Sequence, residues 1–219
     1  MAEYWYRKAI DTPNCEGLYG MNYQAENSLS FLLLTLGHYS EAVIRYQNLA
    51  EKNFIPAQLQ MGRLYHDGMG VTQSYIMSAK WFRKAANLGS SMGQLKMGIM
   101  YSTQHTAHKS SKKSSRSKSK SKSRYHPKNK FNLSYNKKKS RKWYRKAAKQ
   151  NHLSAIFNLA QSYQVHPDRL PADTNVSESM KWFQKAAMLG DTGAMYEIGS
   201  IYYRGDTPKF SSFQKAMEW

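Results

Sequence analysis

The chain has 219 residues, a formal net charge of +19 and one cysteine, Cys15, and its mean hydropathy is −0.73. A single cysteine excludes an internal disulfide, and this favours a reducing, intracellular compartment. The longest apolar run is 31–34 and the start at Met1 has no apolar stretch, so we expect neither a membrane span, which needs about 20 apolar residues, nor a secretory signal. The cytoplasm is the expected location, or the nucleus in a eukaryotic source.

A five-residue word recurs along the chain, with Trp in first place, Phe or Tyr second, Lys fourth and Ala fifth. Four complete copies occur, at 5–9, 81–85, 143–147 and 182–186, and a further copy begins at Trp219. Self-similarity of this kind predicts small units stacked on one another.

A second pattern precedes the later copies of this word. It consists of a small residue, an aliphatic residue or Met four positions later, then Gly or Ala, and Tyr three positions further on. These offsets lie on one side of a helix, which we name helix A; the Trp word lies on the following helix B. The copies are Ala57/Met61/Gly62/Tyr65, Gly93/Met97/Gly98/Tyr101, Ala155/Leu159/Ala160/Tyr163 and Ala194/Ile198/Gly199/Tyr202.

Two further features support a stack of helices. An apolar residue two positions after the first small residue predicts a second buried flank on helix A: Leu59, Leu95, Phe157 and Tyr196. A Gly or Asn after helix B predicts a left-handed helix cap: Asn53, Gly89, Asn151 and Gly190.

These residues resemble the Sel1-like repeat family, which is related to the tetratricopeptide repeats. The resemblance covers roughly 55–102 and 138–219, and its best copy runs from Ala57 to Gly89. Residues 22–53, with a short turn and no Trp, are more similar to an ordinary tetratricopeptide unit. The resemblance implies scaffolding and adaptor roles.

We therefore predict an all-α, right-handed α-solenoid of about five antiparallel helical hairpins. The N-terminal repeats occupy 1–102, with a partial helix B at the start, the tetratricopeptide-like unit at 22–53, a Sel1-like unit at 55–89 and a helix A at 91–102. The C-terminal repeats occupy 137–219, and the last is incomplete. Neither end carries a polar capping repeat, and Pro13 interrupts the first helix B; truncation, a fragment and self-association through the uncapped ends are alternative explanations.

One repeat contains a long insertion between its two helices. The Tyr of helix A and the Trp of helix B are 42 residues apart in the 101–143 copy, against 16, 19 and 17 in the other copies. Segment 103–136 includes an uninterrupted Ser/Lys/Arg run at 109–124, which cannot bury enough apolar surface to offset the entropy of ordering. We predict disorder over 103–136.

The positive charge is concentrated around this insertion. Residues 69–167 contain 22 Lys and Arg and no acid. Three interpretations remain: a solvated filler, a polyanion-binding segment whose affinity falls with salt, and a localisation signal or phosphorylation switch. The polyanion contacts would be Lys109, Lys112, Lys113, Arg116, Lys118, Lys120, Lys122, Arg124, Lys137, Lys138, Lys139, Arg141 and Lys142.

No residue pattern indicates catalysis, a cofactor or a metal site. The nearest metal-like spacing is His105-x-x-His108, which lacks a further Cys, Asp or Glu ligand. A binding face is predicted on helix A instead, at offsets of three and six from the first small residue. Its members are Gln60, Arg63, Lys96, Asn158, Gln161 and Glu197.

The sequence thus predicts a non-catalytic scaffold that binds a protein or peptide partner on its helix-A face, with the basic segment attracting acidic partners. The alternative is a protein that binds nucleic acid or another polyanion through 109–142.

Overall fold

The structure is a computed structural model, and it describes residues 1–11, 19–103, 133, 135–164 and 175–204. All regular structure in these residues is α-helical. The helices are α1 Ala2–Asp11, α2 Tyr19–Thr35, α3 Tyr39–Glu51, α4 Ile55–Asp67, α5 Tyr75–Asn87, α6 Ser91–Ser102, α7 Lys137–Lys149, α8 Leu153–Tyr163, α9 Val176–Met188 and α10 Thr192–Arg204.

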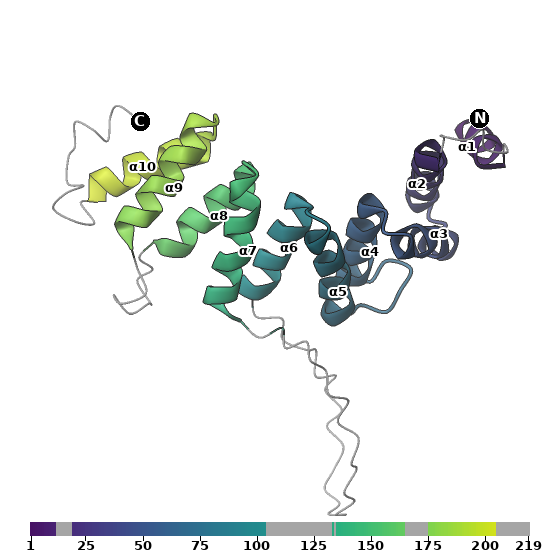
Figure 1. Cartoon of the computed structure of the whole chain (residues 1–219), viewed down its shortest axis with the longest axis horizontal. Helices are drawn as coiled ribbons and strands as arrows, with labels where there is room; N and C mark the ends of the chain where they lie inside the picture. The colour runs from purple at the N-terminus through teal and green to yellow at the C-terminus, as the bar shows by residue number, and fades with distance from the viewer. Residues whose placement is uncertain (12–18, 104–132, 134, 165–174, 205–219) are drawn as a thin grey trace, which may run out of the picture.

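Each helix packs chiefly against the helices that precede and follow it in the chain. The result is the curved row in Figure 1, with α1 and α10 at opposite ends. Four hairpins, α2/α3 to α8/α9, lie between an unpaired helix B (α1) and a helix A (α10). The predicted all-α solenoid is confirmed. Among the described helices, none is long and apolar enough to span a membrane.

The predicted helix caps are confirmed by the backbone geometry. Asn53 and Asn151 have φ values of 63° and 56°, and Gly89 and Gly190 have φ values of 93° and 87°. Only residues that tolerate the left-handed region close a helix in this way. Each cap therefore turns the chain from a helix B into the next helix A.

The first predicted flank of helix A forms the core. Its small and aliphatic members are fully buried in α4, α8 and α10, as at Ala57, Leu159 and Ile198. The second flank is buried or half-buried at its first three positions, but the prediction is wrong for Tyr196, which is 75% exposed. The position needs a following helix to cover it. Phe157 on α8 packs edge to face against Phe183 on α9, with ring centroids 5.4 Å apart, whereas α10 is the last described helix.

The second aromatic residue of the word inserts against the glycine of the preceding helix A. A Cβ atom added to Gly62 would lie 2.4 Å from the Phe82 ring, and one added to Gly98 would lie 2.3 Å from the Tyr144 ring. Both rings are buried. Glycine at these two positions therefore lets helix A and helix B pack closely.

A backbone hydrogen bond closes each of the three complete Sel1-type hairpins at its open end. The N–H that precedes helix B donates to the carbonyl of the helix-A Tyr, from Ser74 to Tyr65 at 2.8 Å and from Asn136 to Tyr101 at 2.8 Å. Asn175 donates to Tyr163 at 3.0 Å. The same residues cap helix B, because their side-chain oxygens accept the N–H of the residue three positions on. Hairpin closure is thus independent of the length of the connection.

Part of the segment expected to be disordered is placed. Leu133 packs against the cluster that contains Phe82 and Met97, Tyr135 lines a pocket, and Asn136 caps α7. The prediction is wrong for these residues, because an apolar contact and a helix cap fix them. The basic run at 109–124 lies outside the described residues.

A buried serine lies three positions before the Trp of each later word, and in two of the three it ties helix B to helix A. Ser140 Oγ donates to Gly98 O at 2.8 Å, and Ser179 Oγ donates to Ala160 O at 2.9 Å. Ser78 is equally buried, but its Oγ has no hydrogen-bond partner among the described residues. The sequence analysis missed these serines, although their recurrence before Trp81, Trp143 and Trp182 was visible.

The N-terminal end of the stack is less covered than its centre. No residue of α1 is buried, and Trp5 is 56% exposed, whereas Trp81 in the middle of the stack is 7% exposed. Self-association through the ends stays a prediction. Pro13 and Trp219 lie outside the described residues.

Shortening the insertion should leave the fold intact. Deleting 109–124 leaves 18 of the 34 residues that separate Tyr101 from Asn136, and loop closure entropy changes by only about 0.6 kcal/mol. We expect the same helical circular dichroism and a melting temperature within about 3 °C of the parent. A large loss of stability would show that the basic run packs on the solenoid.

The two serines Ser140 and Ser78 offer a matched test of the helix-B tie. Ser140→Ala should destabilise the protein by about 1 kcal/mol, because a buried hydrogen bond is lost. Ser78→Ala removes a hydroxyl that has no partner and should cost no stability. Urea unfolding followed by circular dichroism measures both changes, and equal losses would contradict the assignment.

Candidate functional site

The predicted helix-A face contains a groove between α4 and α6, with a volume of about 550 Å³. Three of the predicted face residues line it: Gln60, Arg63 and Lys96. Both helices contribute because successive helices A lie next to each other, as the packing of Leu59 on α4 against the cluster that contains Met97 and Met100 on α6 shows.

The groove has an apolar floor and a charged rim. Phe82, which is 4% exposed, lies at the floor with Leu59 and Met100. On the rim, Arg63 Nε lies 3.6 Å from Asp67 Oδ2, and Lys96 projects from α6. Such a site suits an apolar side chain whose neighbours are polar or acidic.

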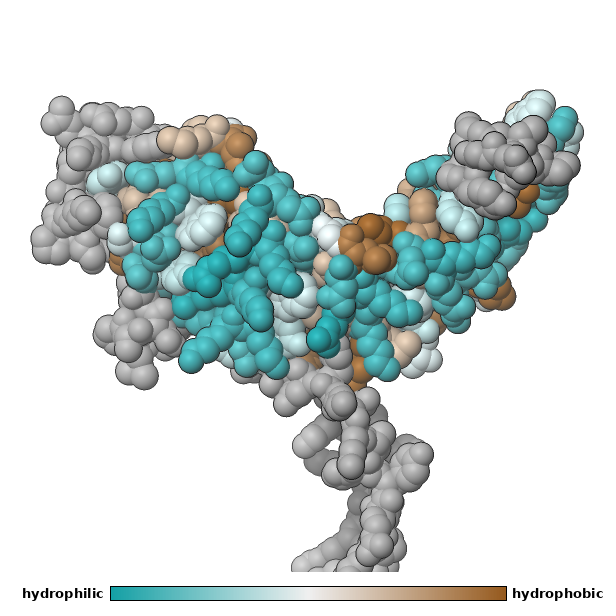
Figure 2. All heavy atoms as spheres, in the orientation of Figure 1, coloured by the Kyte–Doolittle hydropathy of each residue, from teal (hydrophilic) through white to brown (hydrophobic). Residues whose placement is uncertain are grey.

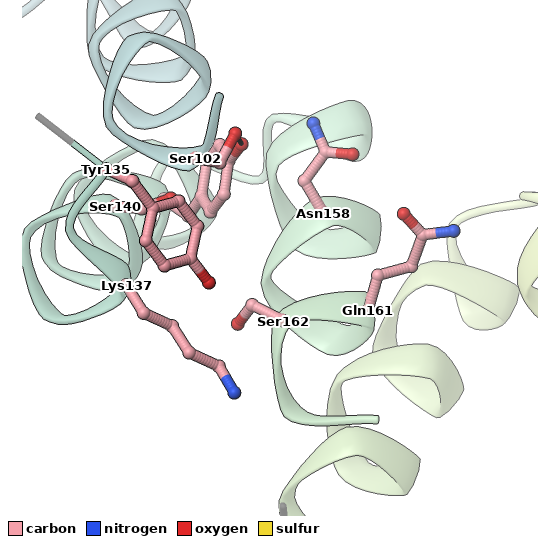
Figure 3. Close-up of a pocket in the computed structure, with 8 residues that line it drawn as sticks. Ser102, Tyr135, Lys137, Ser140, Asn158, Gln161 and Ser162 are labelled. Atoms are coloured by element: carbon pink, nitrogen blue, oxygen red, sulfur yellow. Dashed lines mark hydrogen bonds between the residues drawn. The ribbon is translucent and has the colours of Figure 1, made fainter. Parts of the chain in front are cut away.

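A second, smaller pocket lies one repeat further along, among α6, α7 and α8. Its volume is about 200 Å³, and two more predicted face residues, Asn158 and Gln161, line it (Figure 3). We name it the polar pocket. Its other lining residues are Ser102, Tyr135, Lys137, Ser140, Tyr144 and Ser162.

Hydrogen bonds fix the wall of the polar pocket on the α6 side. Burial raises the pKa of the Tyr144 phenol, and its hydrogen bonds to Ser102 and Ser140 oppose the shift. The phenol therefore stays protonated and donates to Ser102 Oγ at 3.2 Å, and that hydroxyl donates to Ile99 O at 2.9 Å. This wall is preorganised by contacts within the protein.

The last predicted face residue lies in neither cavity. Glu197 Oε2 on α10 accepts a hydrogen bond from Gln164 Nε2 at 2.8 Å. Its carboxylate thus links the end of α8 to α10, while the other five members line the groove or the polar pocket.

The predicted polyanion contacts divide into three groups. The eight at 109–124 lie outside the described residues. Arg141 is engaged within the fold: its guanidinium lies 4.0 Å from the centroid of the Tyr163 ring, and its Nε donates to Ser162 Oγ at 3.1 Å. Lys137, Lys138, Lys139 and Lys142 lie on the first half of α7, and the last three are exposed.

The outer surface of helix B carries a regular feature that the sequence analysis missed. The Lys of each word lies over the Trp ring three residues before it, at 5.2 Å for Lys8, 4.0 Å for Lys84, 4.6 Å for Lys146 and 5.8 Å for Lys185. The spacing of three positions on a helix could have revealed these pairs. Each Lys covers an indole with its stem and keeps its charge outside.

The helix-B surface carries the most Lys and Arg residues on α7. Lys138, Lys142 and Lys149 are exposed, and within the described chain no carboxylate pairs with them. Figure 2 shows a largely hydrophilic surface where α7 and its neighbours lie in Figure 1. No large exposed apolar side chain belongs to α7.

The described residues offer no candidate metal site. These residues contain no group of three His, Cys, Asp or Glu side chains placed to hold a metal ion. The candidate pair at 105 and 108 lies outside them.

Solved structures with similar architecture contain Sel1 repeats. The crystal structure of c5321, a protective antigen present in uropathogenic Escherichia coli strains and displaying an SLR fold, matches 99% of this chain at 24% identity with a TM-score of 0.69. A Sel1 repeat protein from Oxalobacter formigenes matches 93% at 20% identity with a TM-score of 0.65. The chain spans 39% of the first protein and 73% of the second. At these identities the matches show the fold alone.

Family membership follows from the sequence. No curated protein matches the chain. The sequence model of the Sel1 repeat matches residues 1–11, 55–90, 131–152, 153–191 and 192–219, which are the repeats that carry the Trp words. It leaves 12–54 and 91–130 unmatched. The first stretch contains the α2/α3 hairpin with its short turn, and the second contains α6. The chain belongs to the Sel1 repeat family.

Proposed function

We propose that this protein is a non-catalytic scaffold that binds an extended segment of a partner protein along its helix-A face. Sel1 repeat proteins are typically scaffolds for protein interactions, and this chain belongs to that family. The observation that carries the proposal is the groove between α4 and α6, whose floor is apolar and whose rim includes Arg63 and Lys96.

The groove favours a partner segment with an apolar side chain flanked by acidic residues. The Phe82 ring and Leu59 offer the apolar contact, and burial of one apolar side chain contributes about 1.5–3 kcal/mol. Lys96 on the α6 wall attracts negative charge, whereas Arg63 on the α4 wall shares its charge with Asp67. Such charges add specificity more than affinity. The face residues differ in type from one helix A to the next. A surface that recognises a particular peptide sequence requires such differences.

Selection from a phage-displayed library of random 12-residue peptides on the whole chain tests this function. We expect the enriched peptides to share an apolar residue next to acidic ones. Met92→Glu should weaken their binding by about tenfold or more, because Met92 lines the groove and the change places a carboxylate at its apolar wall.

Ile76→Glu is the matched control. Ile76 and Met92 are each the second residue of a helix and are 36% and 40% exposed, but Ile76 does not line the groove. We expect Ile76→Glu to leave binding within about twofold of the parent. Equal effects of the two changes, or no enrichment, would contradict the groove as the binding site.

A second candidate function is polyanion binding through 109–142, and one observation favours it. Lys138 and Lys142 are exposed on α7 without a carboxylate partner in the described chain, and α7 itself carries no large exposed apolar side chain. Lysine is depleted in protein–protein interfaces, whereas phosphate backbones bind such surfaces by releasing counterions.

Oligonucleotide binding at about 50 and 200 mM salt tests this candidate. We expect the affinity of the whole chain to fall steeply with salt. Deletion of 109–124, and separately Lys138→Gln with Lys142→Gln, should each weaken binding and reduce the salt slope. Lys52→Gln on the distant α3 end is the control. Binding that is absent at low salt, or unchanged in both variants, would exclude this function.

A further inference from the structure

We propose that the polar pocket binds an anionic side chain, a carboxylate or a phosphorylated residue, of the same partner segment that occupies the groove. This inference rests on the proposed function, because it assigns a second contact to that segment. It specifies which chemistry the partner must carry next to its apolar anchor.

The lining of the pocket consists of donors of hydrogen bonds and lacks any acid. Lys137, Tyr135, Asn158 and Gln161 line it and carry an ammonium, a hydroxyl and two amides. Lys137 is the first residue of α7, and Tyr135 lies two positions before it. In Figure 3 both side chains extend toward α8, the helix that carries Ser162 and Gln161. No Asp or Glu occurs between 68 and 167, so α6, α7 and α8 bring no carboxylate to the lining. Lys137 already interacts within the protein, and it contributes its positive charge to the pocket.

Several of these donors are available to a ligand. Tyr135, Asn158 and Gln161 line the pocket without a side-chain hydrogen bond to the described chain. Ser140, in contrast, is committed to Gly98 O, and Tyr144 is committed to Ser102. The pocket thus combines a fixed wall with donors that can turn toward an anion, and ionised acceptors form the stronger hydrogen bonds.

The size of the pocket fits a single side-chain group. Sites that enclose whole small molecules measure about 300–1,000 Å³, whereas this pocket measures about 200 Å³. A carboxylate or a phosphate at the end of a side chain requires less space than such molecules. The pocket is therefore suited to one residue of a longer segment.

The positions of the two cavities define the spacing of the partner residues. The groove lies between α4 and α6 and the polar pocket between α6 and α8, one repeat apart. The helix α6 separates the two cavities; a helix with its side chains is about 10–12 Å wide, and an extended chain advances about 3.3 Å per residue. A segment that fills both cavities carries its apolar and anionic residues about three positions apart.

Titration of the whole chain with blocked single amino acids, followed by amide NMR, tests the pocket. The probes are N-acetyl-phosphoserine amide, N-acetyl-glutamate amide and the neutral N-acetyl-serine amide. We expect saturable binding of one or both anionic probes, with shifts at the end of α6, the start of α7 and the end of α8. The two anionic probes distinguish a phosphate from a carboxylate as the preferred group.

Adjacent lysines provide the matched variants. Lys137→Gln should weaken anionic binding by at least about fivefold, because the ammonium lines the pocket. Lys138→Gln, which removes the same charge outside the pocket, should change it by less than about twofold. Gln161→Glu keeps the shape of an exposed side chain and adds a carboxylate to the lining, so it should abolish anionic binding.

Three outcomes would overturn the inference: no saturable binding, equally tight binding of the neutral probe, and equal losses in the two lysine variants. These probes are too small to occupy the groove as well. A failed peptide selection with successful probe binding would therefore remove the proposed function alone, and the reverse result would remove only the anion pocket.

Discussion

The close contact between a glycine of helix A and an aromatic ring of helix B is the constraint on which the rest of the structure depends. At Gly62 and Gly98 the rings of Phe82 and Tyr144 lie where a side chain would otherwise stand. The contact sets the distance between the two helices in the α4/α5 and α6/α7 pairs, and Ala160 takes the place of the glycine in α8. A side chain at either glycine would force the ring outward, and the neighbouring repeat would have to move with it.

The same contact also builds the binding surfaces. The edge of the Phe82 ring forms part of the groove floor, and Tyr144 belongs to the wall of the polar pocket. Residues that hold the stack together therefore also line the two candidate binding cavities. Substitution of these aromatic residues would change stability and binding together, and only exposed rim residues separate the two effects.

The sequence predicted the repeat, the helices and the caps because each depends on local spacing. Asn151 and Gly190, for example, needed only their place after an Ala pair and their tolerance of positive φ. Tyr196 was misassigned because its burial depends on a following helix that the local pattern does not contain. The recurrence of a serine before the Trp could have revealed the position of these side chains but not their contacts. Ser140 donates a hydrogen bond to a carbonyl 42 residues away, whereas the equivalent Ser78 has no partner among the described residues.

The candidate site was predictable as a face but not as cavities. Five of the six predicted face residues line the groove or the polar pocket, since helix periodicity defines which side chains point outward. Tyr135 and Lys137 were not assigned to this face, because they follow an insertion whose path no periodicity describes. For Arg141 the sequence suggested a solvent-exposed charge in a basic cluster. In the structure its guanidinium lies over the Tyr163 ring.

The hydrogen bond from Asn136 to Tyr101 has a consequence for how such a chain can change over generations. Because the hairpin is joined at that pair, sequence can be gained or lost between the two residues with little effect on the helices on either side. New segments can therefore be acquired there and kept or discarded according to their usefulness, while the stack continues to work. The same point of attachment offers an engineer a place to graft an epitope, a fluorophore or a second binding motif beside the helix-A face.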